Sequence, residues 1–309
     1  MSDARLWPAP AKVNLGLRVV GRRADGYHLL ESSFAPLDLA DRLCIAIAPA
    51  HAAEVHVAVT GHAAGVPVGP DNLVVRAAHA YLKSAGVAAR VEIELEKVVP
   101  VGAGLGGGSS DAATVLRALS EHFANAIARS DLADLALSLG ADVPFFLDPR
   151  PAWVTGVGEG IEPFDVPLPA LDLVLVTPSP GLPTAEVFRA WDAALTPSGA
   201  SRRMPALRGS PGRNLIAALE YEGPSLSELL INDLEPVATK LRPAIQRIRG
   251  ELERLGARVV AMSGSGPTVF GLFRTSEQAR VAASMGRFDA TDRVLVARTV
   301  DASARWGVV

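Results

Sequence analysis

The sequence predicts an α+β protein of two domains, with a mixed α/β domain over residues 1–162 and a ferredoxin-like domain over residues 163–309. Helical and strand periodicities alternate along the whole chain. Its 309 residues are also more than one domain usually holds. The second half shows the element order β-α-β-β-α-β, which is typical of a ferredoxin-like sandwich with extra helices inserted in the first crossover.

Alternating apolar and polar residues predict the elements of the first half. Strands are expected at Val13–Val19, Leu43–Ala48, Glu54–Thr60 and Val91–Glu96, and helices at Asn72–Ser84 and Asp131–Leu139. The dipeptide Asp25-Gly26 indicates a tight hairpin turn, because such a turn needs residues that tolerate positive φ. Tyr27 and His28 follow this turn directly.

The second half is predicted in the same way. Strands are expected at Leu173–Thr177, Arg258–Met262, Thr268–Phe273 and Arg293–Thr299, and helices at Thr184–Ala194, Asn214–Glu222, Leu226–Leu230, Leu234–Leu255 and Ser276–Met285. The helix from Leu234 is expected to be interrupted at Pro236 and Pro243. The stretch Thr196–Arg213, rich in Pro, Ser, Gly and Arg, is predicted to be a variable loop.

Composition limits the classes of partner. The net charge of −3, with 20% charged and 49% hydrophobic residues, gives no electrostatic basis for binding nucleic acid or an anionic membrane. No apolar run approaches the ~18 residues of a membrane helix, and the N-terminus lacks a signal core. The single cysteine, Cys44, excludes an internal disulfide, and the six histidines lack metal-ligand spacing. We expect a cytoplasmic protein with small-molecule partners and no transition metal, and the sequence does not indicate its oligomeric state.

A glycine-rich loop, PVGAGLGGGSSDAA from Pro100 to Ala113, joins the strand at Val91–Glu96 to an amphipathic helix. Candidate N-caps for that helix are Ser109, Ser110 and Asp111. Glycines let a backbone approach a ligand closely, and the first turn of a helix offers free N–H groups and a favourable dipole. The loop is therefore predicted to bind the phosphates of a nucleotide.

Two better-known phosphate motifs fit this loop poorly. Gly102, Gly104 and Gly107 satisfy G-x-G-x-x-G, but a dinucleotide site needs a second strand ending in an acidic residue about 20 residues later. The predicted helix and a turn at 125–130 occupy that place. A P-loop needs a lysine after its last glycine, and this loop contains none. A lysine must come from elsewhere in the chain.

Asp142 is a lone carboxylate in the segment Ala-Asp-Val-Pro-Phe-Phe, residues 141–146. Burying it without a partner is unfavourable, so we expect a nearby cation or a catalytic role. An alternative is that Asp142 caps the next short helix. Lys12 and Asn14 begin the polar face of the first strand.

Three glycine-bearing stretches carry a resemblance to a known family. They are PAKVNLGL from Pro10, PVGAGLGGGSSDAA from Pro100 and MSGSGPTVF from Met262, in the order and at the spacing of the GHMP kinases, which the chain resembles over nearly its whole length. The stretches RADGYHLLES, DNLVVRAA, SLGADVPFF and NDLEPVA resemble the branch that phosphorylates the 2-hydroxyl of a cytidylyl methylerythritol in non-mevalonate isoprenoid biosynthesis. Another GHMP-type kinase, for homoserine, mevalonate or a sugar, stays open as the alternative.

This resemblance implies ATP-dependent transfer of the γ-phosphoryl group, with residue roles as follows. Asp142 is expected to be the general base, and Lys12 to hold Asp142 ionised and offset negative charge on the transferred group. Tyr27 and His28 are expected to hold the cytosine, and Asn14 to lie near the diphosphate and sugar. The expected ATP-binding residues are Pro100, Val101, Gly102, Ala103, Gly104, Leu105, Gly106, Gly107, Gly108, Ser109 and Ser110.

ATP and Mg²⁺ are the implied cofactors, since the metal bridges phosphate oxygens in phosphoryl transfer. No carboxylate pair for the metal is evident, so no metal-ligating residue is assigned, and Ser109 or Ser110 is expected to supply one ligand at most. Asp111 would repel phosphate and is assigned to helix capping. Two alternatives outside the kinases are a nicotinamide-dependent oxidoreductase and a noncatalytic ATP-binding regulator.

Overall fold

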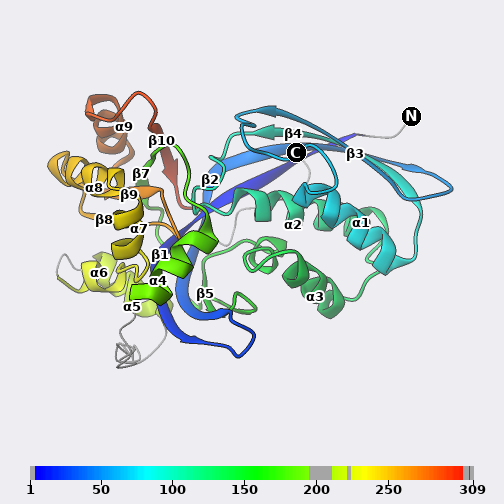
Figure 1. Ribbon diagram of the computed structural model, residues 1–309, viewed down its shortest axis with the longest axis horizontal. Coiled ribbons are helices and arrows are strands. Elements are labelled where there is room, and N and C mark those ends of the chain that lie inside the picture. Colours follow the sequence, from blue (N-terminus) through cyan, green and yellow to red (C-terminus); the bar gives the residue numbers. More distant parts are fainter. Residues whose placement is uncertain (1–3, 195–210, 221–223, 302–305, 307–309) are drawn as a thin grey trace.

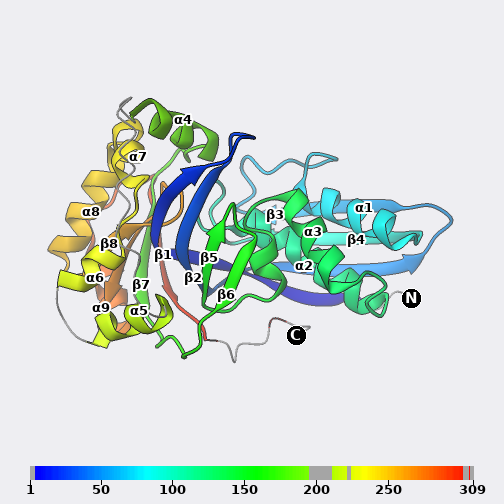
Figure 2. The ribbon, with the colours of Figure 1, turned by 90° about the horizontal axis from the view of Figure 1, so that it is seen from below.

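The computed structural model describes residues 4–194, 211–220, 224–301 and 306 as two β-sheets with helices packed against them (Figure 1). The first sheet has the strand order β3-β4-β2-β5-β6, with β1 paired to β2. Its elements are β1 (Arg5–Arg22), β2 (His28–Pro49), β3 (Glu54–Gly61), β4 (Ala89–Lys97), β5 (Ala152–Gly156) and β6 (Gly160–Pro163), with helices α1 (Leu73–Ala85), α2 (Gly107–His122) and α3 (Arg129–Leu139) and the 3₁₀ helix η1 (Pro144–Leu147). The three α-helices cover one face of this sheet (Figures 1 and 2).

Strand β1 is much longer than the predicted Val13–Val19. It contains Pro8 and Pro10. Proline has no backbone N–H, so it cannot make all the hydrogen bonds that a strand with neighbours on both sides requires. Because β1 is attached to the sheet through β2, its outer edge tolerates prolines. The predicted hairpin turn is confirmed, since Gly26 joins β1 to β2 with φ of 93°. The hairpin end of β1 and β2 lies beside helix α4 (Thr184–Ala194) (Figure 2).

The start of helix α2 differs from the prediction. The helix begins at Gly107, and its N-cap is Gly106, in the left-handed region with φ of 73° and without a side-chain hydrogen bond. The assignment of Ser109, Ser110 or Asp111 as N-cap is therefore wrong. Glycine adopts the left-handed conformation without steric penalty. The chain can therefore start the helix at Gly107, before any of the three predicted capping residues. Within the described residues, the N-cap of α2 thus supplies no side-chain acceptor to the N–H groups of the first turn.

The second sheet has the order β10-β7-β9-β8 and is antiparallel throughout. Its elements are β7 (Asp172–Thr177), β8 (Val259–Met262), β9 (Val269–Phe273) and β10 (Arg293–Arg298), with helices α4 (Thr184–Ala194), α5 (Pro211–Glu220), α6 (Pro224–Leu229), α7 (Glu235–Leu241), α8 (Ala244–Arg254) and α9 (Ser276–Met285). This order and connectivity confirm the predicted ferredoxin-like domain.

Two predictions in this half need correction. The expected interruption of Leu234–Leu255 at Pro243 is confirmed, since α7 and α8 are separate helices with Pro243 between them. Proline removes a helical hydrogen bond and clashes with the preceding turn. The expected interruption at Pro236 is wrong. Pro236 instead lies in the first turn of α7, where proline is tolerated. The predicted loop Thr196–Arg213 ends too late, since α5 already begins at Pro211, and residues 196–210 lie outside the described residues.

The two sheets share apolar packing. One buried cluster combines Ala11, Val13 and Leu15 of β1 with Leu173 of β7 and Phe270 of β9. All strands of the first sheet end by Pro163, and those of the second begin at Asp172, so we propose a domain boundary at residues 162–163. No helix in the described residues is long and apolar enough to cross a membrane.

Candidate active site

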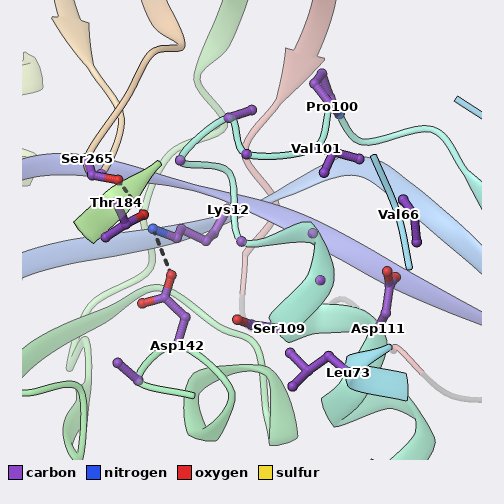
Figure 3. Close-up of a pocket in the computed structure, with 18 of the residues that line it drawn as sticks. Lys12, Val66, Leu73, Pro100, Val101, Ser109, Asp111, Asp142, Thr184 and Ser265 are labelled. Carbon is purple, nitrogen blue, oxygen red and sulfur yellow. Dashed lines mark hydrogen bonds and ion pairs between the residues drawn. The ribbon is translucent and has the colours of Figure 1, made fainter. Parts of the chain in front are cut away.

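A cavity of about 480 Å³ opens where the two sheets meet (Figure 3). Its walls come from β1, the loop after β4, the start of α2, the segment before η1, helix α4 and the loop after β8. Among the residues that line it are Lys12, Asn14, Val66, Leu73, Lys97, Asp111, Asp142, Thr184, Phe188 and Ser265. The cavity thus brings together all three glycine-bearing stretches of the sequence.

Lys12 lies on the cavity wall and is only 2% exposed. Its Nζ lies 3.3 Å from Oδ2 of Asp142 and donates a hydrogen bond of 2.5 Å to Oδ1 of Asn14. The same ammonium lies 4.4 Å from the centre of the Phe34 ring, a cation–π distance. A buried ammonium needs such partners, and here they fix its position toward Asp142.

Strand β1 presents Lys12 because its pairing with β2 is interrupted there. The register shifts between Pro10 and Lys12, and the Lys12 backbone N–H donates to the carbonyl of Leu105 at 2.9 Å. The glycine-rich loop is therefore attached directly to the strand that carries the lysine. This explains how a loop without its own lysine acquires one.

Asn14 is 1% exposed and bonded on both ends of its amide. Its Nδ2 donates to Ser32 Oγ at 2.9 Å while its Oδ1 accepts from Lys12. Its backbone N–H donates to Ser263 Oγ at 3.2 Å. These bonds orient Lys12, and the expected contact of Asn14 with a substrate diphosphate stays a prediction.

The Asp142 side chain is 33% exposed and faces the cavity beside Lys12 (Figure 3). It does not cap η1, whose N-cap is Val143 without a side-chain hydrogen bond, so the capping alternative is wrong. The other expectation, a nearby cation, is confirmed by Lys12. A carboxylate that is one-third exposed at the cavity and held by an ammonium can accept a proton from a bound hydroxyl.

Different structural features explain why different positions of the loop are glycines. Gly104 has φ of 75°, and a Cβ there would lie 2.2 Å from the Ser263 carbonyl oxygen, so the two glycine loops pack backbone to backbone. Ser263 Oγ also donates to the Gly104 carbonyl at 3.0 Å. In contrast, a Cβ on Gly108 would meet nothing within 4 Å. The uncapped first turn of α2 thus faces open space, which suits an anion.

The predicted ATP-binding residues lie around this part of the cavity. All of residues 100–110 line it except Leu105 and Ser110. Leu105 packs in the core, and its carbonyl holds Lys12. Ser110 is fully buried, and its Oγ has no hydrogen-bond partner in the described part of the chain.

Asp111 has a different role from the predicted capping. It is 2% exposed, and its Oδ2 accepts a hydrogen bond of 2.6 Å from Lys97 Nζ, which also contacts Asp41. Asp41 in turn accepts the backbone N–H groups of Val98 and Val99 at 2.5 and 2.8 Å. The cluster fastens the end of β4 to α2 directly behind the phosphate loop.

Charge in this cluster is unequally shared. Burial raises the pKa of Asp111 to about 8, against the opposing effect of Lys97. Burial alone would lower the pKa of Lys97, but Asp111 and Asp41 together raise it. Asp41 accepts two backbone N–H groups as well as the ammonium. Asp111, whose pKa burial raises to about 8, is a carboxyl group that holds a proton in the neutral range.

Tyr27 and His28 lie on the β1–β2 hairpin and do not themselves line the cavity. Tyr27 is 64% exposed. The His28 ring stacks on Phe188 of α4, with centroids 4.7 Å apart and planes 20° apart, and its Nε2 lies 2.7 Å from Oδ1 of Asp192. Phe188 does line the cavity, so the hairpin residues lie at its margin.

Sequence reasoning missed Lys97, Phe188 and Asp192. Lys97 stands at the end of the strand before the loop, but the sequence pattern does not indicate that its side chain contacts Asp111. Phe188 and Asp192 lie in a correctly predicted helix, and their spacing resembles ordinary helical amphipathicity. Their relation to His28 arises from a contact between residues 164 positions apart.

The described residues contain no cluster of three or more His, Cys, Asp or Glu side chains that could hold a metal ion. Mg²⁺ keeps several waters and needs few protein ligands when it binds together with phosphates. Ser109, which lines the cavity, is a hydroxyl of the right chemistry.

Family comparisons agree with the two-domain architecture. Residues 72–148 match the family model described as the GHMP kinases N terminal domain, and residues 214–290 match the GHMP kinases C terminal model. The predicted class, a two-domain α+β small-molecule kinase, is confirmed.

Comparison with individual proteins shows to which family of GHMP kinases the chain is similar. The chain is 46% identical over 302 residues to the 4-diphosphocytidyl-2-C-methyl-D-erythritol kinase of Anaeromyxobacter dehalogenans, covering 94% of this chain and 90% of that one. A crystal structure of 4-(cytidine 5'-diphospho)-2C-methyl-D-erythritol kinase matches with a TM-score of 0.76 and 42% identity, over 95% of this chain and 98% of the other. A homoserine kinase from Cytophaga hutchinsonii matches with a TM-score of 0.69 over 98% and 97% of the two chains, but at 18% identity it shares the fold alone. The chain belongs to the GHMP kinases and, within them, to the family of the 4-diphosphocytidyl-2-C-methyl-D-erythritol kinases.

Proposed function

We propose that the chain transfers the γ-phosphoryl group of ATP to the 2-hydroxyl of 4-diphosphocytidyl-2-C-methyl-D-erythritol, a step of non-mevalonate isoprenoid biosynthesis in the cytoplasm. The observation that carries this proposal is the Lys12–Asp142 pair, 3.3 Å apart, on the wall of the cavity that the glycine loop also lines. Phosphoryl transfer depends on positioning and charge neutralisation, and this arrangement supplies both.

Asp142 acts as the general base that accepts the proton of the substrate hydroxyl. Lys12 holds the Asp142 carboxylate in place and offsets negative charge that builds on the transferred group. Asn14 keeps the Lys12 ammonium at that point through the bond to its Oδ1.

ATP lies with its phosphates at the uncapped start of α2, near Gly106 and Gly108. The apolar end of the cavity, lined by Val66, Leu73 and Leu95, accommodates the adenine. Mg²⁺ would be held by the phosphate oxygens with the hydroxyl of Ser109 and would neutralise charge on the phosphates.

The cytosine of the second substrate binds at the hairpin margin. Tyr27 and Phe188 offer aromatic faces, and His28 offers a ring nitrogen, at the end of the arm that carries Lys12. The exposure of Tyr27 leaves its face free for a base.

A coupled assay of ADP release tests this proposal with ATP and a panel of alcohols: the cytidylyl methylerythritol, homoserine, mevalonate and galactose. We expect the cytidylyl alcohol to have the highest kcat/KM. Faster turnover of another alcohol would favour the alternative of a different GHMP-type kinase. ATP binding without turnover of any alcohol would favour the noncatalytic regulator.

A further inference from the structure

Helix α4 contacts the β1–β2 hairpin through one carboxylate. Oδ1 of Asp192 lies 2.7 Å from Nε2 of His28, and Oδ2 lies 3.4 Å from Nη1 of Arg22. The two partners stand opposite each other in the pairing of β1 with β2. Because the His28 side chain is only 9% exposed, solvent competes little for the contact with Asp192.

This contact determines which nitrogen of His28 carries the hydrogen. An ionised carboxylate only accepts hydrogen bonds, so the hydrogen of the His28–Asp192 bond belongs to Nε2. A neutral imidazole has one N–H, which leaves Nδ1 as an acceptor. Nδ1 forms no hydrogen bond with any residue that the structure describes, and one face of the ring is stacked on Phe188. Nδ1 is therefore an acceptor that the described residues leave without a partner.

An acceptor at this position distinguishes two pyrimidines. Cytosine carries an amino donor at N4, where uracil carries a carbonyl acceptor at O4. We infer that Asp192 makes the chain select a cytidylyl over a uridylyl substrate, by holding His28 in the tautomer whose Nδ1 accepts a hydrogen bond from the N4 amino group. This inference rests on the proposed function, because it takes His28 to contact the substrate base. Asp192 is a positioning residue and acts through His28.

The variant Asp192→Asn tests the role of Asp192 in fixing the tautomer of His28, because Arg22 orients the new amide. A guanidinium has donors only, so the amide oxygen turns toward Arg22 and the amide NH₂ toward His28. Nε2 must then accept, and the hydrogen moves to Nδ1. The variant thus presents a donor where the wild type presents an acceptor, with almost no change in shape.

The kinetic experiment compares kcat/KM for cytidylyl and uridylyl methylerythritol in the wild type and in Asp192→Asn. We expect the cytidylyl-to-uridylyl ratio to fall by about tenfold or more, mainly through KM, with the KM for ATP unchanged. Asp192→Ala, which leaves the ring free to adopt either tautomer, should give an intermediate ratio. An equal loss for both substrates would reduce Asp192 to a structural role and overturn the inference.

A second readout needs no turnover. In ¹⁵N-histidine NMR spectra, with His28 assigned by its absence in His28→Gln, we expect the Nε2–H tautomer in the wild type and the Nδ1–H tautomer in Asp192→Asn. Asp289→Asn, which removes a carboxylate from the exposed pair with Arg247, is the matched control and should leave His28 unchanged. The same tautomer in both proteins overturns the inference. A wild type that phosphorylates neither substrate contradicts the proposed function itself, while the spectra still report the tautomer.

Discussion

Nζ of Lys12 lies 3.3 Å from Oδ2 of Asp142, although the two residues are 130 positions apart in the sequence. The lysine is almost fully buried on the edge strand β1, and the aspartate is one-third exposed just before η1. This pairing of a buried cation with a carboxylate open to the cavity gives each group a separate task. The cation is held in place by its partners, and the carboxylate is open to the cavity.

Asp142→Asn should lower kcat by roughly 10²–10⁴, because the amide cannot accept the hydroxyl proton. ATP affinity should be unchanged, since the phosphate loop is intact. Steady-state kinetics and ATP titration measure both quantities. Asp148→Asn, a nearby exposed carboxylate at the end of η1, is the control and should keep normal activity. A kcat within a few-fold of the wild type would remove Asp142 from the role of base.

Gly108→Val should weaken ATP binding while leaving the melting temperature nearly unchanged. A Cβ at Gly108 meets no protein atom within 4 Å, so the new side chain obstructs only the space where phosphate is expected. Gly250→Val, at an equally open glycine in α8, is the matched control. Gly106 is a poor choice, because a Cβ there would lie 2.8 Å from the Phe146 ring. Equal losses of stability in both variants with unchanged ATP affinity would argue against the phosphate site.

Stability should depend on pH through Asp111. Its pKa is raised to about 8 by burial, whereas an unfolded aspartate titrates near pH ~4. Between these values the native state holds one more proton than the unfolded state, so this contribution to stability is complete below pH ~4 and is lost as pH rises toward 8. Asp111→Asn should abolish this component, a slope of about 1.4 kcal/mol per pH unit.

Urea unfolding at pH 5, 6, 7 and 8 measures this difference between Asp111→Asn and the wild type. Asp289→Asn, at an exposed carboxylate, should keep the wild-type slope. Parallel pH profiles for the wild type and Asp111→Asn would mean that Asp111 is ionised in the folded protein.

Tyr27→Ala should raise KM for the cytidylyl substrate roughly 5- to 150-fold and leave KM for ATP unchanged, because base stacking on an aromatic side chain contributes ~1–3 kcal/mol. The exposure of Tyr27 makes a folding defect a poor explanation for such a change. Met285→Ala, at another exposed side chain on α9, controls for loss of surface area. An unchanged cytidylyl KM would show that the hairpin does not hold the base.

Local patterns predicted much of the fold. Helices α4 and α9 have the predicted bounds, because each has clear amphipathic spacing and few competing signals. The predictions that were wrong depended on neighbours. Because Pro8 and Pro10 argue against a strand, the sequence pattern did not predict the start of β1. The prolines are tolerated because β1 lies at the edge of the sheet.

The site was predicted less completely. Lys12 and Asp142 were identified through family resemblance, since no periodicity brings them together. The position of Asp111 in the loop motif suggested a cap, because the sequence cannot show that Lys97 and Asp41 surround it. Phe188 and Asp192 could not be identified from the sequence, because their contacts with His28 join residues that lie far apart in the chain.

The position of the new phosphate ester on the product is the most direct test of the proposed phosphoryl transfer. After incubation of the wild type with ATP, Mg²⁺ and cytidylyl methylerythritol, ¹³C and ³¹P NMR of the product locates the new phosphate ester through its carbon–phosphorus coupling. We predict one phosphate per ADP released, coupled to the carbon that bears the 2-hydroxyl, and formation at least ~10²-fold slower with Asp142→Asn. A phosphate on another oxygen, or ADP release without a phosphorylated alcohol, would contradict this prediction.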